Sequence, residues 1–177
     1  MLLVGENFLS IDIHKLIRFL ILRANGKPTP LGDFLIIDVN DPTDYAKEHI
    51  IGAEHYNRFL LSRNHFETPI LTSARLADRT LVIYGQSANT VTATLHQRGF
   101  KTVFLTGSIP FYKTFYPKGL TSKTGSTLDI SALEEALVNK QNNDRGGRLW
   151  RSTSASRIRS VTPKPATTAK KNMIPWK

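Results

Sequence analysis

Chemistry in this chain would be expected first in a short loop that follows an apolar run, formed by Gly85, Gln86, Ser87, Ala88 and Asn89. The backbone N–H groups of such a loop, together with the start of a following helix, can hold an anion. The same residues can equally form a plain turn, with Ser87 or Asn89 capping the helix. We favour the plain turn and keep the anion site as the alternative.

Other polar residues give weaker signals. Five histidines lack the spacing of a metal site, so we expect no metal and no cofactor: His14, His49, His55, His65 and His96. We expect His49 to support a loop of its own fold, and Asp38 to accept hydrogen bonds at a strand end rather than act as a general base.

The chain contains no cysteine among its 177 residues. Disulfides, thiolate zinc sites and cysteine nucleophiles are therefore excluded. This absence is the firmest chemical statement that the sequence allows.

Alternating strand and helix patterns surround the loop. Three short apolar runs are typical of strands buried on both faces, at residues 34–39, 81–84 and 102–105. The helices predicted beside them cover residues 10–23 with Ser10 as the cap, 41–48, 90–98 and a stretch from Gly107 that must stop before Pro117. Strands alternating with helices predict an α/β domain with a central parallel sheet, three layers deep.

A last helix is predicted at residues 128–144, where Ser131 and Glu134 have the spacing of a capping box. We therefore divide the chain into a domain at 1–127, this helix, and a tail at 145–177 that lacks periodicity and should be disordered when alone in water.

Two stretches resemble the rhodanese-like superfamily. Asp38, followed by the segment 49–53 (His-Ile-Ile-Gly-Ala), is similar to its first signature, although Asn40 stands where arginine is usual. The run ending at Tyr84 is similar to the strand that precedes the catalytic cysteine, and Gly85 takes the place of that cysteine. The resemblance implies a rhodanese-like fold without sulfurtransferase or cysteine-phosphatase activity, because both chemistries need the thiolate.

Within this superfamily the chain resembles the centrosomal and ciliary rhodanese-domain proteins associated with tubulin glutamylation. The resemblance rests on the 49–53 segment with Tyr56, on the turn at 98–100, and on an aromatic residue before a Pro-x-Gly-Leu corner at 116–120. It implies a catalytically degenerate domain that acts by binding.

The net charge of +10 is concentrated in the tail. Nine of the 24 Lys and Arg residues, but none of the 14 acidic ones, lie in 145–177. Such a segment favours anionic surfaces, and tryptophan is enriched at interfaces. The predicted partner-binding residues are Arg145, Arg148, Trp150, Arg151, Arg157, Arg159, Lys164, Lys170, Lys171 and Trp176.

Two functions fit these features. The first is a non-catalytic structural or adaptor protein of the microtubule cytoskeleton, with tubulin and neighbouring axonemal proteins as partners. It would lie in the cytoplasm, in a cilium, flagellum or basal body, and not at a membrane. The second is a basic component of a ribonucleoprotein such as an organellar ribosome, with RNA as the partner. The resemblance favours the first.

Overall fold

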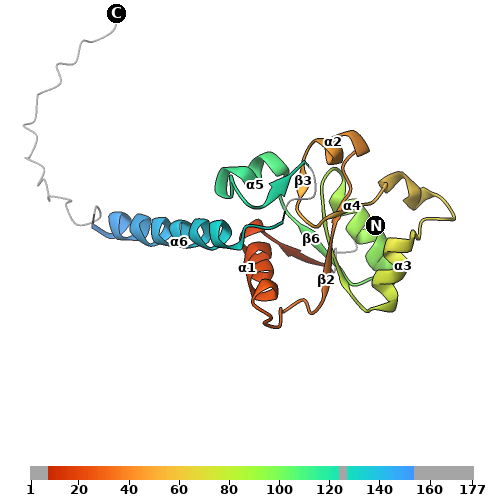
Figure 1. Ribbon diagram of the computed structural model, residues 1–177, viewed down its shortest axis with the longest axis horizontal. Helices are drawn as coiled ribbons and strands as arrows, with labels where there is room; N and C mark the ends of the chain where they lie inside the picture. Colours follow the sequence, from red (N-terminus) through yellow and green to blue (C-terminus); the bar gives the residue numbers. More distant parts are fainter. Residues whose placement is uncertain (1–7, 124–126, 154–177) are drawn as a thin grey trace, which may run out of the picture. The chain divides into compact units, whose positions relative to one another are not determined.

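The computed structural model describes residues 8–123 and 127–153 (Figure 1). Its main sheet has five parallel strands in the order β1-β6-β5-β2-β4. The strands are Leu9–Ile11 (β1), Phe34–Asp38 (β2), Glu54–His55 (β4), Thr80–Tyr84 (β5) and Thr102–Leu105 (β6). The predicted parallel α/β sheet is confirmed.

Helices and a small second sheet complete the fold. Strand β3 (His49–Ile50) pairs with β7 (Thr121–Ser122) in an antiparallel sheet outside the main one. The remaining elements are α1 (Ile13–Ala24), α2 (Pro42–Lys47), the 3-10 helix η1 (Arg58–Ser62), α3 (Pro69–Leu76), α4 (Ala88–Gln97), α5 (Ile109–Phe115) and α6 (Ile130–Thr153).

The central strands form because their residues are apolar on both faces. Every residue of β5 is buried, and β2 pairs with it in parallel from Phe34 opposite Thr80 to Asp38 opposite Tyr84. Helices cover both faces of the sheet, as continuous apolar strands require. One face packs against Leu16 of α1 and Leu133 of α6, and the other against Leu71 of α3 and Leu95 of α4.

The N-terminal prediction was partly wrong. Residues 9–11 are not the start of a helix but form β1, which pairs with β6 from Leu9 opposite Val103. The helix begins at Ile13, and Asp12 caps it instead of Ser10, because the Asp12 side chain accepts a hydrogen bond from the Lys15 N–H at 2.8 Å. Ile11 is buried in the strand.

The last helix also differs from the prediction at both ends. It begins at Ile130, and the Asp129 side chain rather than Ser131 accepts the hydrogen bond from the Ala132 N–H. It continues past residue 144 to Thr153, so the first part of the predicted tail is helical. Adding residues to a formed helix needs no new nucleus, so the two glycines at 146 and 147, costing about 1 kcal/mol each, do not stop it.

The chain divides into two compact units, Met1–Asn142 and Asn143–Lys177. The strands of the sheet and helices α1 to α5 belong to the first unit, and α6 begins in the first unit and ends in the second. Among the described residues, none of the helices is both long and apolar enough to span a bilayer.

Candidate functional site: a closed loop beside a surface pocket

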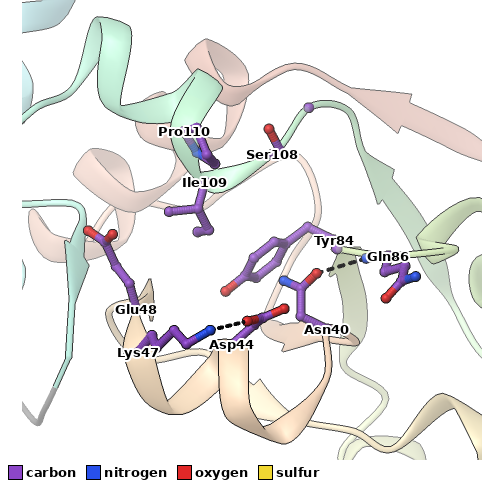
Figure 2. A pocket seen from close by; sticks show the side chains of 11 residues that line it. Asn40, Asp44, Lys47, Glu48, Tyr84, Gln86, Ser108, Ile109 and Pro110 are labelled. Carbon is purple, nitrogen blue, oxygen red and sulfur yellow. Dashed lines mark hydrogen bonds and ion pairs between the residues drawn. The ribbon is translucent and has the colours of Figure 1, made fainter.

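A pocket of about 500 Å³ lies where β2 and β5 end (Figure 2). Ligands of open parallel sheets bind beyond the carboxyl ends of the strands, so the position is the expected one. Its walls come from the turns after three strands and from α2, and its lining residues are Asn40, Asp44, Lys47, Glu48, Tyr84, Gly85, Gln86, Gly107, Ser108, Ile109 and Pro110.

Gly85 begins the turn between β5 and α4 and has a backbone φ of +116°. Side chains rarely adopt this conformation, so the turn suits glycine alone. The predicted loop is also shorter than its five residues. Ala88 and Asn89 already belong to α4, and the Ala88 N–H donates to the Gly85 carbonyl at 3.2 Å.

Ser87 holds the N-cap position of α4, as one of the two predicted caps. It does so through an unusual conformation, with φ +58° and ψ +22°, and its side chain makes no capping hydrogen bond. The turn is therefore fixed by backbone geometry more than by the Ser87 hydroxyl.

Beneath the pocket, Asp38 and Tyr84 form a buried polar pair, and both side chains are 0% exposed. The Tyr84 hydroxyl donates to Asp38 Oδ2 at 2.6 Å and accepts from the Ile50 N–H at 3.0 Å. Asp38 Oδ1 accepts from the Asn40 N–H at 2.8 Å. The prediction that Asp38 accepts hydrogen bonds at a strand end is confirmed.

Burial, followed by the neighbouring Asp38 carboxylate, raises the pKa of Tyr84 well above its ordinary value. The phenol therefore keeps its proton and stays a donor to Asp38. A second buried tyrosine, Tyr112, packs edge-on against it with ring centroids 6.2 Å apart, and its hydroxyl has no hydrogen-bond partner among the described residues.

The histidines near the pocket act as structural donors. His49 stacks on the Tyr45 ring at 4.1 Å and its Nδ1 donates to the Tyr45 carbonyl at 2.8 Å, as expected of a residue that supports its own loop. His55 Nε2 donates to the Asn40 carbonyl at 2.9 Å. Each bond orients its ring from one nitrogen toward a backbone carbonyl, so both histidines stabilise turns of the fold.

Carboxylates and lysines pair along the rim of the pocket. Lys47 contacts Asp44 at 2.9 Å (Figure 2), and Glu48 pairs with Lys113 and accepts from the Thr121 hydroxyl at 2.7 Å. The Thr121 hydrogen bond, with Lys113, lowers the pKa of Glu48. Paired charges of both signs give the rim no excess of positive charge for an anion.

The predicted partner-binding residues fall in the second unit. The backbone of Arg145, Arg148, Trp150 and Arg151 belongs to α6, but their side chains are outside the description. Outside the described residues altogether lie Arg157, Arg159, Lys164, Lys170, Lys171 and Trp176.

Sequence comparison identifies the class of domain that this sheet and loop define. Residues 23–114 match the rhodanese-like domain, and the chain belongs to that family. The fold agrees with this. A solved structure described as a yeast protein tyrosine phosphatase of the rhodanese family superposes with a TM-score of 0.54 at 15% identity, over 67% of this chain and 94% of that chain.

Among characterised relatives, the chain is similar to centrosomal proteins of 41 kDa. It is 34% identical to form B from Xenopus laevis over 58% of this chain and 29% of the relative. It is 29% identical to the human protein over 73% of this chain and 38% of the relative. The chain thus matches only about a third of their length. It is also 32% identical to the thiosulfate sulfurtransferase GlpE of Pseudomonas entomophila, over 55% of this chain and 81% of that enzyme.

Two site residues have roles that the sequence did not predict. Asn40 was noted only as a departure from the family pattern, yet its side chain contacts the loop. Tyr84 was read as part of an apolar strand, and nothing in the sequence marks its hydroxyl as the donor to Asp38.

Proposed function

We propose that this chain is a non-catalytic rhodanese-like protein that serves as a structural or adaptor component of the microtubule cytoskeleton, in a centrosome, cilium or flagellum. The observation that carries the proposal is the similarity to centrosomal proteins. In this chain the loop after β5 begins with Gly85 in place of a catalytic cysteine, and the sequence contains no cysteine at all. The domain acts by docking, and the basic segment 145–177 supplies electrostatic attraction.

The loop supports a binding role. Sulfur transfer and cysteine-dependent phosphate-ester hydrolysis both need a thiolate nucleophile, and Gly85 has no side chain to provide one. The nearby histidines already donate to backbone carbonyls, and the Tyr84 hydroxyl is committed to Asp38. We propose that the GlpE relative shares the fold of this chain without sharing its chemistry.

The charge distribution supports an acidic partner. The tail carries nine basic and no acidic residues, while the preceding 144 residues carry 15 basic and 14 acidic ones and are nearly neutral. Tubulin is strongly acidic, and several weak Lys and Arg contacts on one segment add up through linked binding.

Localising a tagged copy is the first test. Signal at the centrosome, basal body or axoneme supports the proposal. Accumulation in mitochondria, together with binding to structured RNA at physiological salt, would replace it with the ribonucleoprotein role, which the basic tail also fits.

Cosedimentation with microtubules then separates two contributions of the tail. Exposed charges are screened over about 10 Å at 0.1 M salt, so neutralising the Lys and Arg residues should abolish binding that is present only at low salt. An aromatic anchor contributes about 2 kcal/mol when buried at an interface. Replacing Trp150 and Trp176 by alanine should therefore remove the salt-resistant remainder. A charge-neutralised chain that pellets as well as the wild type at low salt would contradict the role of the tail.

A further inference from the structure

The Asn40 side chain fills the space above the loop that begins at Gly85. A methyl group placed on Gly85 would lie 2.9 Å from each of Cγ, Nδ2 and Oδ1 of Asn40, closer than the Cβ atom of a real side chain comes to its neighbours. The volume that a side chain at position 85 would need is therefore already occupied. These two residues are 45 positions apart in the chain, on the turns that follow β2 and β5.

The same side chain also bonds to the loop. Asn40 Oδ1 accepts a hydrogen bond from the Gln86 N–H at 2.9 Å, and Figure 2 shows the carboxamide directed toward the Gln86 backbone. A carboxamide oxygen carries partial negative charge and accepts from an N–H as an oxygen of a bound anion would. One of the N–H groups that could form an anion site is thus bonded within the protein.

Hydrogen bonds to both the backbone N–H and the backbone carbonyl of Asn40 fix its position. Its N–H donates to Asp38 Oδ1 at 2.8 Å, and its carbonyl accepts from His55 Nε2 at 2.9 Å. Asp38 is in turn fixed by the Tyr84 hydroxyl. Because these partners lie in β2, β4 and β5, the sheet itself positions the carboxamide on the loop.

We propose that Asn40 is an internal ligand that closes this loop against external anions. The side chain occupies the space over Gly85 and the acceptor position on Gln86, and the carboxylates of Asp44 and Glu48 along the rim add no attraction for negative charge. The pocket beside Asn40 therefore does not give an anion access to the N–H of Gln86. This closure is separate from the docking role proposed above and does not depend on the partner of the tail.

Hydrogen exchange at the Gln86 amide tests the closure in the full-length chain. Asn40→Ala removes Cγ, Oδ1 and Nδ2 together, and Asn40→Asp keeps an acceptor oxygen in the same place. We expect the Gln86 amide to exchange about tenfold faster in Asn40→Ala than in the wild type, the factor that one ordinary hydrogen bond supplies. Asn40→Asp should keep the slow rate. Equal exchange rates in the wild type and Asn40→Ala would overturn the proposal.

Titration with inorganic phosphate, followed by the amide resonances of Gln86 and Ser87, tests the exclusion of anions. We expect these resonances to shift in Asn40→Ala and to stay fixed in the wild type and in Asn40→Asp. A wild-type chain that shifts at the same phosphate concentration as Asn40→Ala would show that the loop is open and would refute the internal ligand.

A double-mutant cycle tests the contact over Gly85. Gly85→Ala should lower the urea midpoint more in the wild type than in the Asn40→Ala background, where the crowded atoms are gone and only the strain of the positive φ remains. Losses that simply add would mean that Asn40 does not fill the space over Gly85.

Discussion

Removing the hydroxyl from one of two neighbouring buried tyrosines should lower stability strongly, whereas removing it from the other should have little effect or raise stability. Tyr84 and Tyr112 are both 0% exposed, and their rings lie 6.2 Å apart. The Tyr84 hydroxyl serves Asp38 Oδ2 and the Ile50 N–H, while the Tyr112 hydroxyl has no partner among the described residues. The pair therefore allows a matched comparison of a satisfied and an unsatisfied buried hydroxyl.

Tyr84→Phe leaves a buried carboxylate oxygen and a buried N–H without their partner. Each orphaned group costs about 1–3 kcal/mol, so the free energy of unfolding should fall by about 2–6 kcal/mol. Tyr112→Phe removes a polar group that is already unpaired, and its free energy of unfolding should change by less than about 0.5 kcal/mol or rise. Both substitutions keep the ring that fills the core.

Urea unfolding monitored by far-UV circular dichroism gives the free energy of unfolding of each variant and of the wild type under the same conditions. Equal losses for the two variants would refute the reasoning, because packing rather than hydrogen bonding would then decide the cost. A large loss for Tyr112→Phe alone would show that its hydroxyl has a partner, such as a buried water.

Three further outcomes are expected. The pKa of Glu48 is lowered in the folded state, so the stability that its carboxylate contributes is complete above the unfolded pKa and is lost as the pH falls through the folded pKa. Glu48→Gln should therefore make the free energy of unfolding less dependent on pH on the acid side, and an unchanged slope would contradict this. A chain ended after Asp144 should keep a cooperative thermal transition, because the buried Leu133 and the whole sheet precede that point; a molten product would show that the tail belongs to the core. The wild type should lack thiosulfate:cyanide sulfurtransferase and aryl-phosphatase activity because it has no thiol, and Gly85→Cys should lack both because the new Cβ meets Asn40 at a φ of +116°. Turnover above the buffer blank by either protein would refute this.

The sheet interior was predictable from the sequence because each of its strands, β2, β5 and β6, contains three or four consecutive apolar residues. Residues 102–105 were predicted as a strand and form β6 at those positions. The first strand was missed because three residues carry too little periodicity to separate a strand from the helix behind them. Helix α3 was missed for a similar reason: only Leu71 and Ala74 are buried in it, and Thr72 and Ser73 give it a polar surface.

The site was predictable in composition but not in geometry. The glycine at position 85 and the asparagine at position 40 could each be recognised as departures from a family pattern. Their contact could not, because it depends on the parallel register that sets Asp38 opposite Tyr84 and so brings the two following turns together. The buried hydrogen bonds of Tyr84 depend on the same register.

The pairing of β1 with β6 has a consequence for the order in which the domain is assembled during synthesis. Leu9 is synthesised before β2 and β5, whereas its partner Val103 is synthesised after both of them. Closing so long a loop is slow compared with pairing neighbours, so β1 should be the last strand to join. Until then, β6 presents an unpaired edge, and such edges are where nascent chains associate wrongly. When β1 joins, the exposed edge of the sheet passes from β6 to a strand of only three residues, and so short an edge is a poor template for pairing with another chain.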